Sequence, residues 1–260
     1  MDIPANLSDG GFPAWPLPLD ATCAEFARSA VRSVYREFGM PRDLTCDATV
    51  IASEIATNAL LHAYRAERTS SGAGRPELWA YLRRHTGPEI VIKVFDPVPW
   101  TGPARRPPRS APTDATGGRG LHLVDALTAE HGGRWGIHPT RGRLGAAPSP
   151  GKVVFFTVPL PAQATMPPAL PRPRSRRRSA ERIHTLLTAR GLRSHLAADR
   201  SVLHAGAGWQ VWIREESISY HLPGREIAWL PASDEIEVVE RVVRHSEEFT
   251  PVCSPTALPL

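Results

Sequence analysis

The spacing of apolar and polar positions predicts a mixed α and β structure in the first 160 residues. Helical spacing of apolar residues occurs in three stretches, which are about 21–38, 43–64 and 120–132. Strand-like runs occur in four further stretches, which are 77–85, 89–96, 134–138 and 152–160. A short strand is also expected in 14–20, and Thr-Gly-Pro at 86–88 predicts a hairpin. This order predicts a mostly antiparallel sheet with helices on one face, which is an α+β fold.

The pattern changes after residue 160. Proline and arginine dominate residues 161–179, which we interpret as a stiff linker, with an arm that binds an acidic partner or nucleic acid as the alternative. From 180 to 250, a helix, alternating strands such as "WQVWI", "SISYHL" and "EIAWL", and a closing helix predict a small separate α+β domain. The expected organisation is one domain over 14–160, the linker, and a second domain over 180–250.

Composition narrows the class of protein without naming a function. The chain has 260 residues and a formal net charge of +5, and nearly all of its positive charge is arginine, since Lys93 and Lys152 are the only lysines. This balance is weak support for nucleic-acid binding. The three cysteines are scattered, so neither a disulfide framework nor a zinc site is indicated. The longest apolar run, around "VVFFTVPL", is too short to span a membrane, so a soluble cytoplasmic protein is expected.

The second predicted helix carries polar residues where a buried face is expected. Glu54, Asn58 and His62 are spaced by four within "SEIATNALLHAY", and at 100° per residue they span an arc of about 80° on the helix surface. Four apolar residues fall within or beside the same arc, which are Val50, Ile51, Ile55 and Leu61. One buried polar residue alone is usually a satisfied core group. Three on one face favour a binding surface.

Three further stretches add chemistry to that helix. A buried strand ends in Asp96, whose carboxylate can accept a hydrogen bond from an exocyclic amine. The segment 97–116 is rich in proline, arginine and glycine and predicts a long loop that is either functional or disordered. Gly117, Gly118 and Gly120 then lead directly into a helix, whose free N–H groups suit phosphate. Each of these features has an ordinary structural explanation by itself, but together they predict a nucleotide-binding face.

The order of four motifs resembles a known family. The motifs are "SEIATNALLHA", "VFDPVP", "GGRGLHLVDAL" and "GKVVFFTVPL". They resemble the ATP-binding domain of bacterial anti-sigma-factor serine kinases, within the wider family of gyrase, Hsp90, histidine kinases and MutL. The resemblance covers roughly residues 14–160 and implies the two-layer α/β sandwich of the Bergerat type, with ATP and Mg²⁺ as cofactors.

The resemblance also implies residue roles. Asn58 would bind Mg²⁺, Glu54 would be the catalytic base, and Asp96 would contact the adenine amine. The other residues expected to contact the nucleotide are His62, Arg105, Gly117, Gly118, Gly120, Leu121 and Thr157. The loop 97–116 would be an ATP lid. One departure is "DPVPW" in place of the family's D-x-G-x-G, and a proline there is common in the anti-sigma-like branch.

Two functions from different classes follow from this resemblance. One is a serine/threonine protein kinase that phosphorylates an anti-sigma-factor antagonist, sequesters a sigma factor, or does both. The other is a non-catalytic module that binds partners in response to nucleotide. Glu54 favours the kinase, because a pure binding module has no need of a carboxylate at that position. The expected partner is a protein, with a homodimer as a further option, and neither a membrane nor nucleic acid is favoured.

Overall fold

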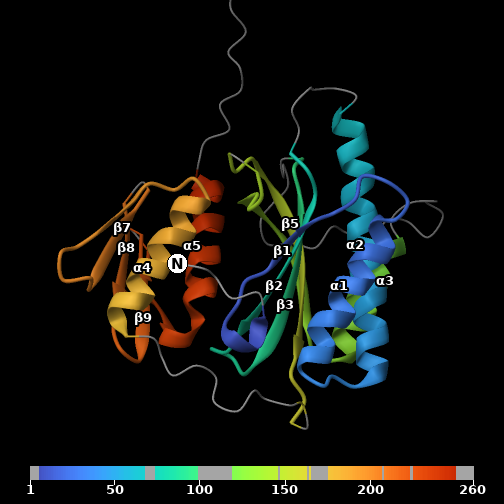
Figure 1. Cartoon of the computed structure of the whole chain (residues 1–260), viewed down its shortest axis with the longest axis horizontal. Helices are drawn as coiled ribbons and strands as arrows, with labels where there is room; N and C mark the ends of the chain where they lie inside the picture. Colours follow the sequence, from blue (N-terminus) through green and yellow to red (C-terminus); the bar gives the residue numbers. More distant parts are fainter. Residues whose placement is uncertain are drawn as a thin grey trace, which may run out of the picture.

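The computed structural model describes residues 6–67, 74–98, 119–145, 147–162, 164, 175–206, 208–222 and 225–249. Four layers of secondary structure follow one another across the molecule (Figure 1). Helices α1, α2 and α3 form the first layer and a five-stranded sheet the second. Helices α4 and α5 form the third layer, and another five-stranded sheet forms the fourth.

The N-terminal unit begins with a short 3-10 helix, η1 (Leu7–Asp9). Its α-helices are α1 (Cys23–Glu37), α2 (Arg42–Glu67) and α3 (Arg119–Glu130). Its strands are β1 (Ala14–Pro16), β2 (Glu77–Arg83), β3 (Glu89–Asp96), β4 (Arg134–Arg141) and β5 (Pro150–Pro159). All neighbouring strands are antiparallel, in the order β1-β2-β3-β5-β4. The predicted antiparallel sheet with helices on one face, and with it the two-layer sandwich, is confirmed.

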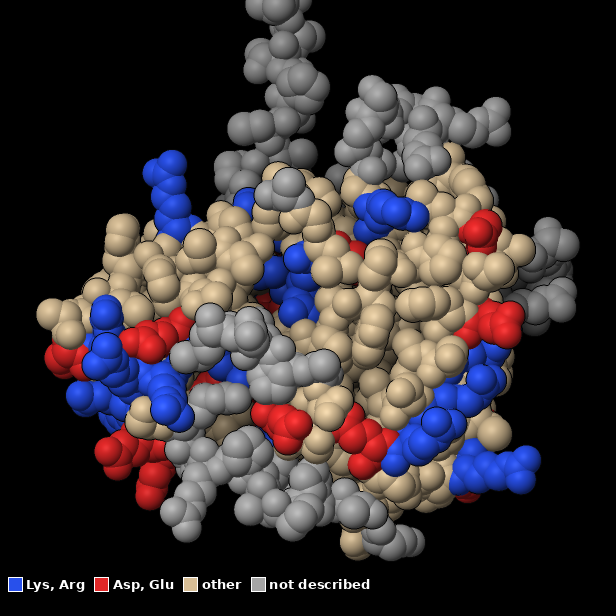
Figure 2. Space-filling model, viewed as in Figure 1, with Lys and Arg blue, Asp and Glu red and all other residues tan. Residues whose placement is uncertain are grey.

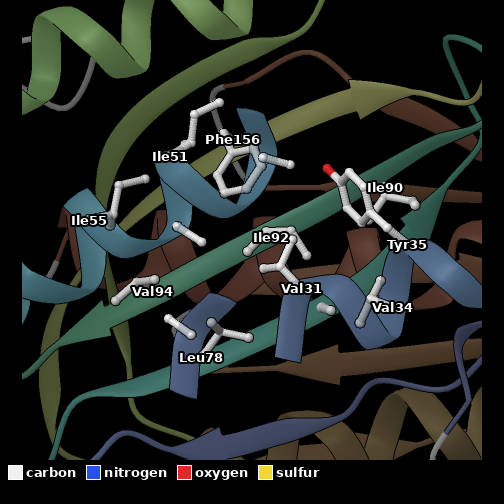
Figure 3. Packing of buried hydrophobic residues seen from close by; sticks show 14 of the residues in the cluster. Val31, Val34, Tyr35, Ile51, Ile55, Leu78, Ile90, Ile92, Val94 and Phe156 are labelled. Atoms are coloured by element: carbon white, nitrogen blue, oxygen red, sulfur yellow. The ribbon is translucent and has the colours of Figure 1, made fainter. Parts of the chain in front are cut away.

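The sandwich is held together by alternate residues of the sheet. Ile90, Ile92 and Val94 of β3 point toward the helices, where they meet residues such as Val31 of α1 and Ile55 of α2 (Figure 3). These side chains are at most 1% exposed, and each contributes about 1.5–3 kcal/mol when it leaves water. The residues between them on β3 face the other side of the sheet, and they are buried as well. The sheet is therefore covered on both faces.

The C-terminal unit supplies the second cover. Its helices are α4 (Arg176–Ala189), the short 3-10 helix η2 (Ala232–Asp234) and α5 (Glu235–Phe249). Its strands are β6 (Ser194–Leu196), β7 (Val202–Ala205), β8 (Trp209–Ile213), β9 (Ser217–His221) and β10 (Ala228–Pro231). They pair in antiparallel fashion in the order β10-β9-β8-β7-β6. Most of the predicted linker lies outside the described residues, and α4 begins within its last residues.

Helix α5 joins the two units. It contacts β2 and β4 of the first sheet on one side and β9 of the second sheet on the other. One apolar cluster runs across this contact, and its members include Trp79, Tyr81, Val91, Phe95, Ile218, Val239 and Val243. The open face of the first sheet is therefore packed by the C-terminal unit through a shared core.

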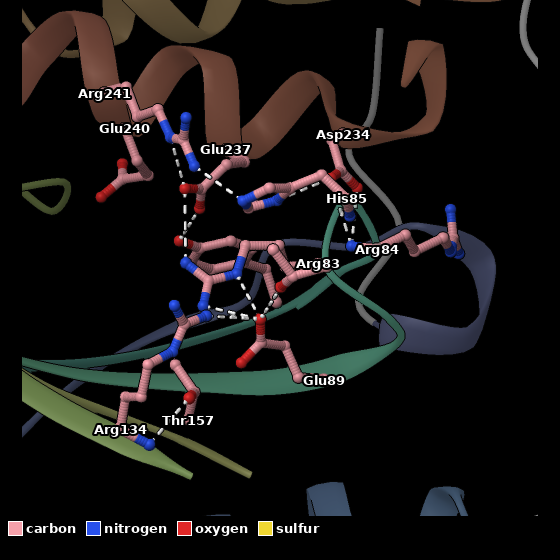
Figure 4. A network of polar contacts seen from close by, with 12 residues as sticks. Arg83, Arg84, His85, Glu89, Arg134, Thr157, Asp234, Glu237, Glu240 and Arg241 are labelled. Atoms are coloured by element: carbon pink, nitrogen blue, oxygen red, sulfur yellow. Dashed lines mark hydrogen bonds and ion pairs between the residues drawn. The ribbon is translucent and has the colours of Figure 1, made fainter. Parts of the chain in front are cut away.

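Charged residues are buried within the same contact. The carboxylate of Glu240 on α5 accepts a hydrogen bond from Lys93 Nζ at 2.9 Å, and it also pairs with Arg190. The carboxylate of Glu237, one turn earlier, accepts from the hydroxyl of Tyr81 at 2.7 Å and lies 3.4 Å from Arg83 NH1 (Figure 4). Both carboxylates are at most 6% exposed. Both of these buried acids are thus matched by cations of the facing elements, as burial of charge requires.

On the face shown in Figure 2, basic and acidic side chains are interspersed between uncharged residues. None of the helices within the described ranges is both long enough and apolar enough to cross a membrane.

We predict that Glu240→Gln weakens the whole fold. Burial would raise the pKa of Glu240, but the charges of Arg190 and Lys93 outweigh burial and lower the pKa to about 2. The substitution leaves both cations buried without their counter-charge, which costs about 3–5 kcal/mol in the free energy of unfolding. Urea denaturation at neutral pH, followed by circular dichroism, measures this difference.

Acid removes the difference, because the folded pKa of Glu240 lies below the ordinary value of 4.5. Its contribution is complete above about pH 4.5 and is lost as the pH falls toward about 2. The control is Glu181→Gln, which breaks an exposed pair with Arg177 and should cost about 0–1 kcal/mol. Equal losses in the two variants at neutral pH would contradict the assignment of a buried ion pair.

Candidate functional site

The polar triplet of α2 lies along the rim of that helix's buried face. Ile51 and Ile55 are at most 1% exposed, and the alanines beside them (Ala48, Ala52, Ala56 and Ala59) let α2 approach the sheet closely. Glu54, Asn58 and His62 are half-buried. The expectation that they sit in the middle of an apolar face is wrong, because two of the apolar residues that define it, Val50 and Leu61, are 36% and 48% exposed.

The first turn of α3 faces two members of this triplet. A Cβ atom placed on Gly120 would lie 2.6 Å from Oε2 of Glu54 and 3.7 Å from Nδ2 of Asn58. Because Gly120 has no side chain, the carboxylate of Glu54 and the amide of Asn58 can lie close to the first turn of α3, and we call this contact between α3 and α2 the cradle. The first N–H groups of a helix have no partner within it, and they favour anions. This end of the site combines phosphate-binding and cation-binding groups.

The other end of the site is built around Asp96, which is 2% exposed. Its Oδ2 atom lies 2.7 Å from Nδ1 of His62 and 2.8 Å from Nζ of Lys152. Its Oδ1 atom accepts a hydrogen bond from the backbone N–H of Val98 at 2.9 Å. Three donors thus hold the carboxylate at the end of β3. The imidazole of His62 is the most accessible of them, since 42% of its side chain is exposed.

Lys152 is the site residue that the sequence did not reveal. It faces Asp96 because the antiparallel register of β3 and β5 pairs these two positions. The preceding Gly151 permits this approach, since a Cβ there would lie 2.4 Å from the carbonyl oxygen of Asp96. The one available signal was composition, because Lys152 is one of two lysines in an arginine-rich chain.

Thr157 is not part of this site. It is completely buried on the opposite face of the sheet, where its hydroxyl accepts a hydrogen bond from the backbone N–H of Arg134 at 3.2 Å (Figure 4). Successive residues of a strand point to opposite faces, so Thr157 cannot share a face with Lys152, five positions earlier. The expected nucleotide contact of Thr157 is therefore withdrawn.

The remaining expected residues are placed only in part. Leu121 is half-buried on α3, next to Gly120. Arg105, Gly117 and Gly118 lie outside the described residues, as does nearly all of the expected lid. No group of three or more His, Cys, Asp and Glu within the described ranges is arranged to hold a metal ion. A cation in this site would be held by the side-chain oxygen of Asn58, together with the phosphates of a nucleotide.

The geometry fits a nucleotide laid along α2. Glu54 and His62 are eight residues apart, which is about 12 Å along a helix. An acceptor for an exocyclic amine, Asp96, lies at one end, and the cradle at Gly120 lies at the other. The acceptor that suits a base and the helix end that suits phosphate therefore lie at opposite ends of this site, which matches the extended shape of a nucleotide.

A two-layer sandwich with this arrangement is characteristic of an ATP-binding domain. Residues 17–137 match the family model of the histidine kinase-like ATPase domain, and the match covers just under half of the chain. A comparison with curated proteins found no match. The domain match supports the histidine kinase-like ATPase superfamily for this segment, with ATP as its nucleotide.

We predict that Gly120→Ala lowers the affinity for Mg·ATP by about tenfold, because the added methyl group fills the cradle beside Glu54. Isothermal titration calorimetry measures the affinity. Thermal unfolding should show equal or slightly higher stability, since alanine is the better helix former by about 1 kcal/mol. Leu123→Ala, an exposed change on the same helix, is the control and should leave the affinity unchanged. Unaltered affinity in Gly120→Ala would contradict a phosphate site at the cradle.

Proposed function

We propose that this protein is an ATP-dependent regulator that acts as a serine/threonine protein kinase on an anti-sigma-factor antagonist, a sigma factor being a further binding partner. The domain match supports ATP binding. The proposal of phosphate transfer is carried by one observation: the carboxylate of Glu54 lies one helical turn from Asn58, and both adjoin the cradle at Gly120. In this proposal Asn58 would bind the cation and Glu54 would accept the proton beside one phosphate site.

The nucleotide would enter with Mg²⁺ held by Asn58. The cation would neutralise the charge of the phosphates, which weakens the bond to the leaving group. The adenine amine would donate to Asp96. His62 supplies a donor to that carboxylate, so we expect base binding to turn the exposed imidazole away from Oδ2. Lys152 would keep the carboxylate in place during this exchange.

The chemical step that we propose is transfer of the γ-phosphoryl group to a serine hydroxyl of the partner. The serine oxygen forms a bond to the γ-phosphorus, the bond from that phosphorus to the β,γ-bridging oxygen breaks, and ADP leaves. Glu54 accepts the proton of the hydroxyl. A half-buried carboxylate beside the phosphate cradle is accessible to a protein substrate, and a positioned base contributes about 10²–10⁴-fold to such a rate.

A nucleotide-sensing module without transfer is the second candidate. It is favoured by the three donors on Asp96, because displacement of His62 by a base gives the protein two states that a partner can distinguish. The two candidates share ATP binding and differ in the role of Glu54.

We expect Asn58→Ala to remove most of the Mg²⁺-dependent affinity for ATP, because the amide oxygen is the proposed cation ligand. Titration calorimetry with and without Mg²⁺ measures the effect, and circular dichroism checks the fold. Thr57→Ala changes the exposed neighbouring residue and is the matched control. Full Mg·ATP affinity in Asn58→Ala would show that the cation is bound elsewhere.

We expect Glu54→Gln to leave ATP affinity nearly unchanged while phosphate transfer falls by about 10²–10⁴-fold, since the amide keeps the shape and loses the base. Radiolabelled transfer to a partner captured from the native cell extract measures the rate, beside a binding titration. Transfer at the wild-type rate would mean that Glu54 is not the base. If the wild-type protein transfers phosphate to no captured partner, the sensing module is the better description.

A further inference from the structure

A cavity of about 480 Å³ lies between the two units, on the face of the first sheet opposite to α2. Its apolar wall includes Val91 and Phe155, and its polar wall includes Lys93, Arg134, Arg241 and Arg244. The sheet separates it from Asp96, so it is distinct from the nucleotide site. Residues of β2, β3, β4 and β5 form one side, and residues of α5 form the other.

The carboxylates that line the cavity are already engaged. Glu237 is held by Tyr81, Arg83 and Arg241, and Glu240 by Lys93 and Arg190. Five cationic residues are among those that line the cavity, which are Arg83, Lys93, Arg134, Arg241 and Arg244. Two carboxylates line it, which are Glu237 and Glu240, and Glu89 and Glu248 bind its arginines from outside the lining. The described lining therefore carries more cationic than acidic side chains.

The floor of the cavity adds no negative charge. Nδ1 of His138 lies 2.9 Å from the carbonyl oxygen of Pro139, so Nδ1 carries the proton and Nε2 is the acceptor toward Lys93 Nζ at 3.4 Å. Burial, reinforced by the charge of Lys93, holds the pKa of His138 well below its ordinary value, and the ring is neutral. The ammonium group of Lys93 is 5% exposed and lies beside the cavity.

Arg134 stands at the mouth of the cavity. Its side chain is 58% exposed, and its one carboxylate partner in the described part of the chain is Glu89, which also binds Arg83 (Figure 4). Since Arg134 has five N–H donors and that contact uses NH2, the guanidinium retains donors for a ligand. An anion that entered here would meet Arg134 first and then the buried charge of Lys93.

We propose that this cavity binds a small organic dianion with a flat apolar body, either a phosphomonoester or a dicarboxylate. The negative charge of a dianion complements the cationic excess of the lining. The apolar body packs against Val91 and Phe155. Because the ligand contacts both the first sheet and α5, it binds the docked form of the C-terminal unit and stabilises that form by mass action.

The experiment is isothermal titration calorimetry of the full chain at constant ionic strength with three probes. Phenylphosphonate is an aromatic dianion that represents the phosphomonoester, and phthalate is one that represents the dicarboxylate. Benzamide is a neutral aromatic of similar size. We expect one or both dianions to bind and benzamide to bind at least tenfold more weakly. Binding of phenylphosphonate alone assigns the phosphate source, and binding of phthalate alone assigns the carboxylate source. Binding of neither dianion, or equal binding of benzamide, overturns the proposal.

Two variants locate the binding. Arg134→Gln should lower the affinity for the dianion by about tenfold or more, because charge-assisted hydrogen bonds are stronger than neutral ones. Arg177→Gln removes an exposed arginine of α4 that does not line the cavity, and it should have no effect. Equal losses in these two variants would show that only non-specific attraction is at work. Circular dichroism checks that both variants are folded.

A final set of measurements distinguishes binding in this cavity from binding in the nucleotide site. Saturating Mg·ATP should not displace the dianion, and Asn58→Ala should bind it as the wild type does. Displacement by Mg·ATP, or loss of binding in Asn58→Ala with retention in Arg134→Gln, would place the dianion in the cradle at Gly120 and overturn the proposal. This test does not depend on phosphate transfer, so it can fail or succeed independently of the kinase proposal.

Discussion

Burial of the first sheet on both faces is the constraint on which the rest of the structure depends. Every residue of β2 and β3 is buried, so each face of the sheet must be covered by another layer. The helices α1 to α3 cover one face mainly with apolar side chains, and His62 of α2 binds Asp96 on the same face. The second cover is partly ionic, because Lys93 and Arg83 project from the other face and must be matched by the acids of α5. Two cations on one face of a hydrophobic sheet thus require acidic residues on the helix that covers it. The pairing of these charges fixes the position of the C-terminal unit on the sheet.

Local patterns predicted most of the secondary structure. The helices α1, α2 and α3 and the strands β2 to β5 were visible because their periodicity and their turns are encoded in neighbouring residues. The rim position of Glu54 was not predictable, because it depends on how closely the alanines of α2 approach the sheet. The pairing of Lys152 with Asp96 depends on the register of two strands that are far apart in sequence. Thr157 lies an odd number of residues after Lys152 and therefore points to the opposite face of the sheet. This could exclude Thr157 from the site only when the face that carries the site was known.

The nucleotide site and the interdomain cavity are built on the two faces of one strand. β3 carries Asp96 on the face of the helices and Lys93, three residues earlier, on the face of α5. β5 also contributes to both sites, because Lys152 lies on the face of the helices and Phe155 on the face of α5. Small shifts of these central strands would be felt at both sites, because protein interiors are close-packed and transmit strain. A ligand in the cavity can therefore influence the nucleotide site without any contact between the C-terminal unit and the nucleotide.

The distribution of lysine gives the protein an unusual chemical surface. The chain contains two lysines, and the side chains of Lys93 and Lys152 are 5% and 9% exposed, each bound to a carboxylate. Their amines are the nucleophiles for acylating labels and amine-directed cross-linkers, and a buried ammonium ion in a salt bridge is a poor nucleophile. Acylation of Lys93 would report separation of α5 from the sheet, and acylation of Lys152 would report opening around Asp96. The native chain thus carries two internal reporters, one for each face of its central sheet.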